Sequence, residues 1–144
     1  MTVAAMLRHK GYDVVSVSAT ERIDAVSERL ARRGIGAVVV LDAARQLLGI
    51  VSERDIVRAI AAGGARALEM TAGQLMTRSL RTVTPETTTE RAMALMTEGR
   101  CRHLPVISRG ELVGIISIGD VVKALMLTRD HEVDSLRAYV TGTV

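Results

Sequence analysis

The sequence contains the stretch GIVSERDIVRA at residues 49–59, and a closely related stretch, GIISIGDVVKA, follows at residues 114–124. Each copy consists of a short apolar run, a Ser, two further residues, an Asp, and then apolar residues at helical spacing. This pattern predicts a strand that leads directly into a helix, with the Ser as N-cap and the Asp as the third helical residue. A helix N-terminus offers backbone N–H groups and a positive dipole end to an anion such as a phosphate. The repeated stretch therefore predicts two related small-molecule sites.

The duplication extends over most of the chain. Residues 16–18 align with residues 82–84, and residues 37–40 align with residues 103–106. One residue is lost in the turn that precedes the second copy of the motif, where a duplication tolerates such a change. Residues 2–7 also resemble residues 71–76, which indicates that a short lead-in helix is duplicated as well.

Each copy predicts the element order β-α-β-β-α. In the first copy we expect strands and helices at residues 14–17, 20–33, 37–41, 47–51 and 53–62, the last helix burying Ile56, Val57 and Ile60. In the second copy we expect a helix from Pro85 to Glu98, strands at residues 103–107 and 112–116, and a helix from Ile118 to about Tyr139. The fold class is therefore mixed α/β (α+β).

The predicted organisation is residues 1–70 as repeat 1, residues 71–127 as repeat 2 and residues 128–144 as a C-terminal helical extension. A repeat of roughly 65 residues buries only a marginal core by itself. We therefore expect the two repeats to pack together with pseudo-twofold symmetry.

The composition disfavours several classes of protein. The longest apolar runs fall well short of the roughly 18 residues that span a membrane, and the first residues lack the apolar centre of a secretory signal, so we expect no membrane association and a cytoplasmic location. The single cysteine, Cys101, fits a reducing compartment. The net charge is only +3 and aromatic residues make up 1% of the chain, so we expect no nucleic-acid partner.

Two copies of Gly-x-x-Ser-x-x-Asp, with Arg102-His103-Leu104-Pro105-Val106 before the second copy, resemble a stand-alone tandem pair of cystathionine-β-synthase (CBS) domains, also called a Bateman module. The resemblance covers residues 2–127. It implies a homodimeric regulatory module, not an enzyme, that signals to an unidentified protein partner by conformational change. The implied ligand is an adenosine-containing molecule (AMP, ADP, ATP, S-adenosylmethionine or NAD) bound in clefts between the repeats.

The resemblance also assigns roles to residues. Asp55 and Asp120 would accept hydrogen bonds from the ribose hydroxyls, which suits a carboxylate because it would repel a phosphate. Ser52 and Ser117 would lie near the phosphate. The full set of implied ligand-binding residues is Ser18, Ala37, Ser52, Arg54, Asp55, Thr84, Arg102, His103, Leu104, Pro105, Ser117 and Asp120.

The two sites are expected to be unequal. Repeat 1 has Gly36 and Ala37 where repeat 2 has Arg102 and His103. The first site would therefore rely on Arg54 or on groups from the other repeat, and the Asp120 site is expected to bind phosphate better.

A structural interpretation stays open beside the functional one. Ser-x-x-Asp is also a capping box, which stabilises a helix without any ligand. The alternative function is a constitutive homodimeric scaffold with vestigial ligand sites. Its interface would use the apolar faces of the helices that follow the two motifs, at Ile56, Ile60, Val121 and Leu125. We expect no catalytic residue and no metal site, because the sequence pairs no nucleophile with an acid or base and shows no metal-ligand spacing.

Overall fold

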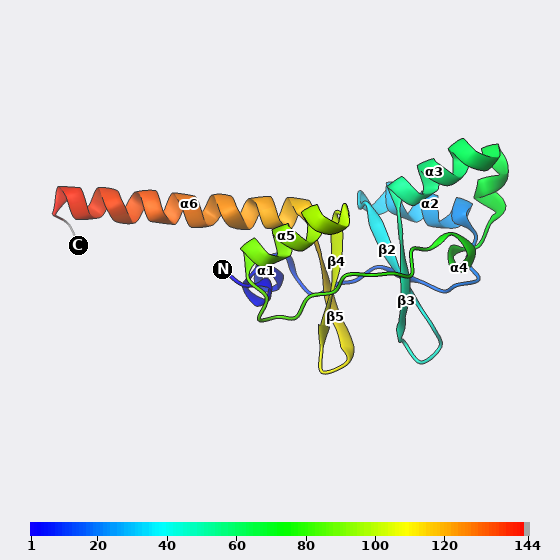
Figure 1. The fold of residues 1–144 in the computed structure, drawn as a ribbon, viewed down its shortest axis with the longest axis horizontal. Helices are drawn as coiled ribbons and strands as arrows, with labels where there is room; N and C mark the ends of the chain where they lie inside the picture. The colour runs from blue at the N-terminus through cyan, green and yellow to red at the C-terminus, as the bar shows by residue number, and fades with distance from the viewer. Residues whose placement is uncertain (143–144) are drawn as a thin grey trace. The chain divides into compact units, whose positions relative to one another are not determined.

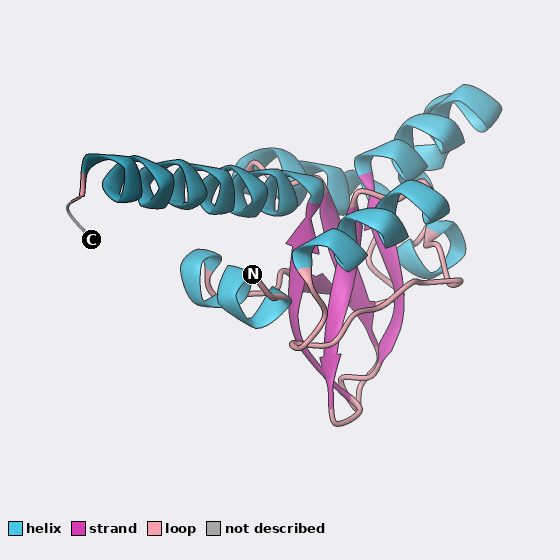
Figure 2. Ribbon diagram, turned by 60° about the vertical axis from the view of Figure 1, so that its left-hand side comes forward, coloured by secondary structure: helices cyan, strands magenta, loops and turns pink. Residues whose placement is uncertain are grey.

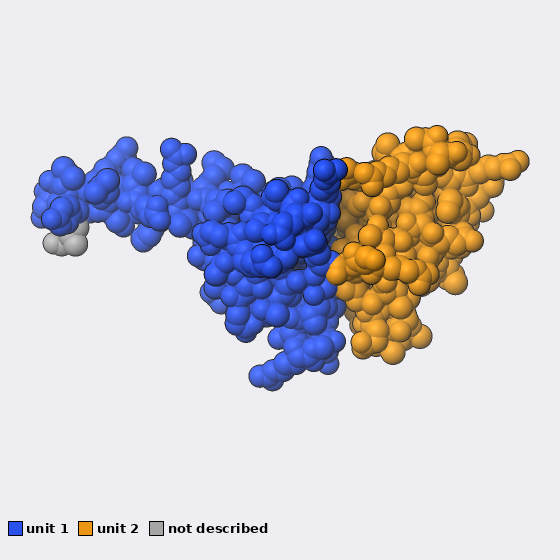
Figure 3. Space-filling model, viewed as in Figure 1, with its two compact units in different colours: residues 1–12, 81–144 blue, residues 13–80 orange. Residues whose placement is uncertain are grey.

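The computed structural model describes residues 1–142 and divides into two compact units (Figure 3). Unit 1 comprises residues 1–12 and 81–144, and unit 2 comprises residues 13–80. Each unit therefore combines most of one sequence repeat with the lead-in segment of the other. The short helix α1 (Val3–Lys10) belongs to unit 1, and α4 (Ala72–Leu75) belongs to unit 2.

Unit 2 is built on a three-stranded sheet in the order β1 (Ser16–Val17), β2 (Ala37–Leu41) and β3 (Leu47–Ser52). Strand β1 is parallel to β2, and β2 is antiparallel to β3. Helices α2 (Ile23–Arg33) and α3 (Glu53–Gly63), followed by the 3-10 helix η1 (Gly64–Glu69), complete the unit (Figure 1). Its core is an apolar cluster of sheet and helix residues, among them Val38, Val51, Ile23 and Ile56.

Unit 1 repeats this plan with a hairpin of β4 (His103–Ser108) and β5 (Glu111–Ser117). Val83 forms a parallel bridge with Val106 and occupies the place that β1 has in unit 2. Helices α5 (Thr89–Gly99) and α6 (Ile118–Thr141) follow the order of repeat 1, and α1 adds Val3, Met6 and Leu7 to the core. Figure 2 shows α6 as one continuous helix. The predicted mixed fold is confirmed, and the predicted end of the last helix near Tyr139 is close to its actual end at Thr141.

Two helices begin later than predicted. Helix α2 starts at Ile23, not Thr20, and α5 starts at Thr89, not Pro85. Before α5, the Thr84 N–H donates to Thr87 Oγ1 at 3.0 Å, and Thr88 caps the helix by accepting from the Arg91 N–H. These threonine bonds hold residues 84–88 in a turn, although Pro85 had predicted that the helix begins there.

The prediction that α3 buries three apolar residues is correct only for Ile56. Val57 and Ile60 are 65% and 40% exposed. The predicted dimer surface also changes, because Ile56 and Val121 are buried in the cores of their own units and are not available to a second copy. The homodimer itself stays a prediction.

Candidate functional site

The strand register places the two motifs in the same local setting. In unit 2, Ala37 at the start of β2 lies opposite Ser52 at the end of β3. In unit 1, His103 at the start of β4 lies opposite Ser117 at the end of β5. Each serine is the last residue of a strand and the N-cap of the following helix, α3 or α6. The structure thus places Ala37 and His103 next to the motif serines, and their role in ligand binding stays a prediction.

Both motifs form complete capping boxes. In unit 2 the Ser52 N–H donates to Asp55 Oδ2 at 2.9 Å, and the Asp55 N–H donates to Ser52 Oγ at 3.2 Å. In unit 1 the corresponding distances are 2.7 and 3.2 Å between Ser117 and Asp120. These bonds hold each carboxylate beside its serine and at the N-terminus of its helix.

The N-terminus of each helix is less open to an anion than the sequence predicts. The first helical N–H of α3, from Glu53, donates to the Gly36 carbonyl at 2.9 Å, and that of α6, from Ile118, donates to the Arg102 carbonyl at 2.8 Å. The third N–H of each helix donates to the motif serine. Two of the first three N–H groups in each helix are therefore bonded within the protein, and the aspartate side chain becomes the more prominent feature of the site.

The Asp55 carboxylate accepts hydrogen bonds at both of its oxygens. Ser52 donates to Oδ2 through its N–H and its hydroxyl, both at 2.9 Å. Thr77 donates its hydroxyl to Oδ1 at 3.1 Å. The environment of Asp55 is thus polar, but these contacts bring no cation to the carboxylate.

The Asp120 carboxylate is paired with a cation. Lys10 Nζ lies 2.6 Å from Asp120 Oδ2 and also donates to the Ile115 carbonyl at 2.9 Å. The Lys10 side chain is 31% exposed and that of Asp120 is 21% exposed, so the pair is partly shielded from solvent. Burial raises the pKa of the Asp120 carboxyl, but the bonds from Lys10 and Ser117 outweigh it. The net pKa lies below the ordinary value of 3.8.

The glycine of each motif explains how the donors reach the aspartates. A Cβ at Gly49 would lie 2.7 Å from the Thr77 carbonyl oxygen, and one at Gly114 would lie 2.8 Å from Leu7 Cδ2. Thr77 exchanges backbone hydrogen bonds with Ile50, at 2.8 and 3.1 Å. A lead-in segment therefore lies close to the strand before each motif. At Gly49 the neighbouring atom belongs to the backbone, so this approach requires glycine, whereas at Gly114 it is the end of the Leu7 side chain, which can shift.

A shallow hollow in unit 1 lies beside the Asp120 pair, between α1 and α6. Its lining residues include three basic side chains and one carboxylate: Met1, Met6, His9, Lys10, Asp120, Lys123, Ala124 and Leu127. Because Asp120 pairs with Lys10, the lysine of this lining that the pair leaves over is Lys123.

Two of the predicted residues, Ser18 and Thr84, lie at the other end of the sheet in their units. Strand β1 pairs Val17 with Val40, which places Ser18 at the end of β2 remote from Ala37, roughly 13 Å along the strand. The bridge between Val83 and Val106 places Thr84 equally far from His103. Within one unit, the structure does not bring Ser18 or Thr84 to the motif aspartate.

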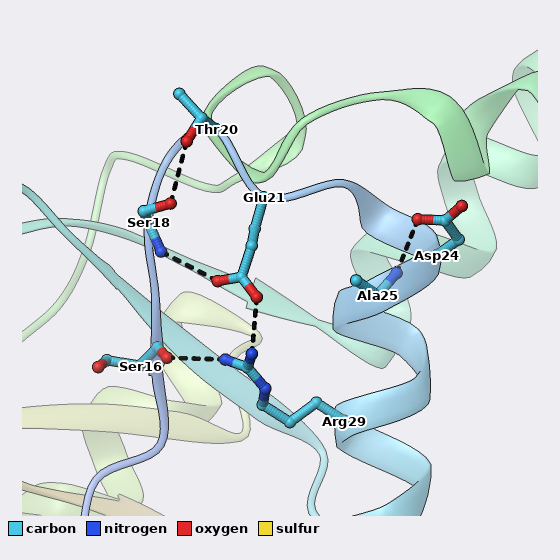
Figure 4. A network of polar contacts seen from close by, with 7 residues as sticks. All are labelled: Ser16, Ser18, Thr20, Glu21, Asp24, Ala25 and Arg29. Atoms are coloured by element: carbon cyan, nitrogen blue, oxygen red, sulfur yellow. Dashed lines mark hydrogen bonds and ion pairs between the residues drawn. The ribbon is translucent and has the colours of Figure 1, made fainter.

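Ser18 is part of a local network that accounts for the late start of α2 (Figure 4). Its N–H donates to Glu21 Oε2 at 3.3 Å, and its hydroxyl is bonded to that of Thr20. Arg29 links Glu21 to the Ser16 carbonyl at 2.7 and 3.0 Å. These bonds give Ser18 a structural role in the turn between β1 and α2.

Strand β4 is paired along both edges at its centre. The Pro105 carbonyl accepts from the Val83 N–H at 3.0 Å, and Leu104 pairs with Ile116. Leu104 and Pro105 are buried, whereas Arg54 and Arg102 are exposed beside the motifs. The Pro105 carbonyl is therefore already bonded within unit 1.

Sequence reasoning missed Lys10 and Thr77, which donate hydrogen bonds to the motif aspartates from segments remote in sequence. The lead-in duplication pointed to the right segments, residues 2–7 and 71–76, but each donor lies just after them. Lys10 and Thr77 are not at matching positions of the duplication, so no repeat pattern marks them.

The family is decided by a comparison with known domains. A family model described as "CBS domain" matches residues 4–62 and 72–127. The chain belongs to the CBS domain family. The duplicated motif is thus the repeat of a CBS pair, and the resemblance based on the sequence is confirmed.

Individual CBS proteins are similar over most of the chain. The "CBS domain-containing protein CBSX3, mitochondrial" of Arabidopsis thaliana is 42% identical over 83% of this chain, which spans 59% of the length of the plant protein. The crystal structure of the CBS-domain containing protein ATU1752 from Agrobacterium tumefaciens is 46% identical, with a TM-score of 0.84 over 85% of this chain and 92% of that one.

Two solved relatives contain adenosine compounds. The CBS domain protein PAE2072 from Pyrobaculum aerophilum, complexed with AMP, is 29% identical, with a TM-score of 0.73 over 83% of this chain and 89% of that one. The CBS domain pair of MJ0100, in complex with 5-methylthioadenosine and S-adenosyl-L-methionine, is 19% identical, with a TM-score of 0.78 over 89% and 98%. At 19% identity, the similarity to the MJ0100 domain pair shows a shared fold and nothing more.

Membrane-spanning helices and metal-ligand clusters are both absent from residues 1–142. In this part of the chain, no helix combines the length and apolar character needed to cross a membrane. The same residues contain no group of three or more His, Cys, Asp or Glu side chains placed to hold a metal ion.

Proposed function

We propose that this CBS pair is a regulatory module that binds an adenosine-containing ligand at its two Ser-x-x-Asp motifs. The observation that carries the proposal is that both units hold a carboxylate in the same orientation by the same capping box, in a chain whose relative is complexed with AMP. Two hydroxyl donors on adjacent ribose carbons match the two oxygens of such a carboxylate. The ligand class is AMP, ADP, ATP, S-adenosylmethionine or NAD.

The Asp120 site is the better candidate for a phosphate-bearing ligand. Its neighbourhood contains the basic residues Lys10, Arg102 and His103, whereas Arg54 is the basic residue beside the Asp55 motif, which also has Thr77 and Ala37 nearby. When a ribose binds Asp120, the Lys10 ammonium can turn to a phosphate without leaving the site. We therefore expect AMP to bind this site more tightly than adenosine does, and calorimetry should resolve two unequal sites.

The proposed output is a change in the affinity for a protein partner. Such coupling between two sites typically amounts to about 1–3 kcal/mol. The chain itself would perform no catalysis. The cleft between the repeats and the cytoplasmic location stay predictions, and the plant relative is described as mitochondrial.

A constitutive scaffold is the second candidate, and one observation favours it. Both motif carboxylates already bond within the protein, Asp55 to Ser52 and Thr77, and Asp120 to Ser117 and Lys10. The capping boxes therefore stabilise α3 and α6 without any ligand. In this case no adenosine compound would change the stability of the protein.

Thermal unfolding in the presence of AMP, ADP, ATP, S-adenosylmethionine and NAD distinguishes the two functions. A ligand at one hundred times its dissociation constant adds about 2.7 kcal/mol of stability. Asp55→Asn and Asp120→Asn retain an oxygen for the capping box but remove the charge, and each should weaken binding at its own site roughly tenfold or more.

Asp42→Asn is the matched control. Asp42 follows β2 at the end remote from Ala37 and accepts a bond from the Gln46 N–H, which an asparagine oxygen can also accept. This variant should bind as the wild type does. Stabilisation by none of the five compounds would support the scaffold, and equal binding by all three variants would refute the assignment of the ribose to the motif aspartates.

A further inference from the structure

The C-terminal half of α6 extends beyond the body of unit 1 as a single helix (Figures 1 and 3). The buried residues of α6 are Val121 and Ala124, near its start. From Arg129 to Thr141 every side chain is exposed except that of Ala138, which is half-buried. We call residues 129–141 the arm.

The arm has little support as an isolated helix. A helix of about 13 residues is only marginally stable in water without tertiary packing. Asp130 and Asp134 are four residues apart on the same face, where like charges are destabilising. A partner that covers one face of the arm would account for its helical structure.

An apolar row with coiled-coil spacing runs along this helix. It alternates steps of four and three residues through Val122, Met126, Arg129, Val133, Leu136 and Val140. We call these six residues the heptad row. Its five apolar members are between 40% and 76% exposed. Such a row corresponds to the a and d positions of a heptad repeat, which pack against another helix.

The heptad row is not covered by unit 1 itself. With Met126 at an a position, the buried residues Val121 and Ala124 fall at c and f, on the opposite side of the helix. Helix α6 therefore packs against its own unit with one face and exposes the row on the other. The row is continuous from the packed half of α6 through the arm.

The charges beside the row favour a parallel pairing of identical helices. In a parallel pair, Glu132 at g faces Arg137 at e of the second copy, an attractive contact made twice. In an antiparallel pair centred on the heptad row, near residue 131, Asp130 meets Asp130 and Glu132 meets Glu132 of the second copy, and Lys123 approaches Arg137. All three of these contacts are repulsive.

The residues of the row also favour two strands. Valine occupies two of the three a positions, Val133 and Val140, and Leu136 occupies a d position, a combination typical of parallel dimers. Arg129 at the remaining d position of the arm lies beside Asp130 of the second copy at e. A single charged residue in such a row reduces stability but fixes the register.

We propose that two copies of this chain associate through a parallel, in-register coiled coil formed by the heptad row, residues 122–140 of α6. A second copy fits this face better than an acidic membrane does, because the arm contains three carboxylates against two arginines. This surface differs from the one predicted from the sequence at Ile56, Ile60, Val121 and Leu125.

Sedimentation equilibrium of the full chain over a range of concentrations tests the proposal. The wild type should be dimeric, and Leu136→Glu should raise the dissociation constant roughly 100-fold or more, since two buried leucines are lost at once. The matched control is Ser135→Glu, which adds the same charge at the neighbouring c position and should leave the dimer intact. All three proteins should give the same melting curve for the two cores, because neither residue is buried.

Two further variants test the orientation. Glu132→Arg should weaken the dimer, and adding Arg137→Glu should restore it, because the exchanged charges attract again. Val140→Cys in a Cys101→Ser background should form an interchain disulfide under mild oxidation in a parallel pair. A monomeric wild type, a dimer that Leu136→Glu leaves unchanged, a failure of the charge exchange to restore association, or the absence of the disulfide would each overturn the proposal.

Discussion

Replacing Lys10 with methionine would remove the ammonium group that binds Asp120 while keeping most of the apolar stem of the side chain. Lys10 Nζ donates to Asp120 Oδ2 at 2.6 Å and to the Ile115 carbonyl at 2.9 Å. In the Lys10→Met variant the carboxylate keeps its bond from the Ser117 N–H but loses its counterion in a partly buried place. We expect the variant to be less stable than the wild type at neutral pH.

The size of the loss follows from the exposure of the pair. Fully exposed ion pairs contribute about 0.2–1 kcal/mol, and buried hydrogen bonds to charged groups contribute about 1.5–3 kcal/mol. With side chains 31% and 21% exposed, the Lys10–Asp120 pair lies between these classes. A loss of about 1–2 kcal/mol corresponds to a melting temperature lower by roughly 3–6 °C for a chain of this length.

The effect should depend on pH in a defined direction. The pKa of Asp120 is lowered in the folded protein from its ordinary value of 3.8. A carboxyl with a lowered pKa contributes its full stability above the pKa of the unfolded state and loses it as the pH falls through the folded value. The difference between wild type and Lys10→Met should therefore be constant from pH 7 down to about pH 5 and should disappear in strong acid.

Thermal unfolding at a series of pH values measures this difference, with Lys123→Met as the control. Lys123 lines the same hollow and is exposed, so its replacement should change stability by less than about 0.5 kcal/mol. Equal melting temperatures for the two variants at pH 7 would refute the role of the ion pair. A difference that persisted unchanged at pH 2.5 would show that packing, not charge, is responsible.

Two backbone predictions complete the set. Gly49→Ala should lower the free energy of unfolding in urea by about 1–3 kcal/mol, because its Cβ would lie 2.7 Å from the Thr77 carbonyl oxygen. Gly63→Ala is the control, since its Cβ would have nothing within 4 Å, and it should change the free energy of unfolding by less than about 0.5 kcal/mol. Gly34→Ala should cost about 1 kcal/mol although its surroundings are open, because Gly34 ends α2 with φ of +61°. Gly34→Ala as stable as the wild type would refute the second prediction.

The fold was largely predictable because the sequence contains the same pattern of strands and helices twice. Strand β2 matches the predicted residues 37–41, and β3 and β5 each lead into a helix at the predicted serine. The helix starts were less predictable, since Pro85 suits a first helical residue but also suits a turn. Residues 84–88 form a turn instead of a helical segment because the Thr87 hydroxyl accepts a bond within the turn and the Thr88 hydroxyl caps α5.

The candidate site was only half predictable, because its two parts have different origins. The serine and aspartate of each motif interact within one turn of helix, so their spacing alone predicts the capping box. The other half comes from segments that are remote in sequence and meet the motif only after folding. Lys10 reaches Asp120 and Thr77 reaches Asp55 because each lead-in segment folds with the other repeat.

This division of the site suggests how a duplicated motif can acquire two different functions. The glycine of each motif admits a lead-in segment close to the strand, and that segment supplies the donor to the aspartate. A change from threonine to lysine in a lead-in segment alters the charge beside the carboxylate without altering the motif. We therefore expect the ligand preference of a CBS site to follow its lead-in segment as well as its motif. A Thr77→Lys variant whose preference for AMP over adenosine stays unchanged at the Asp55 site would contradict this expectation.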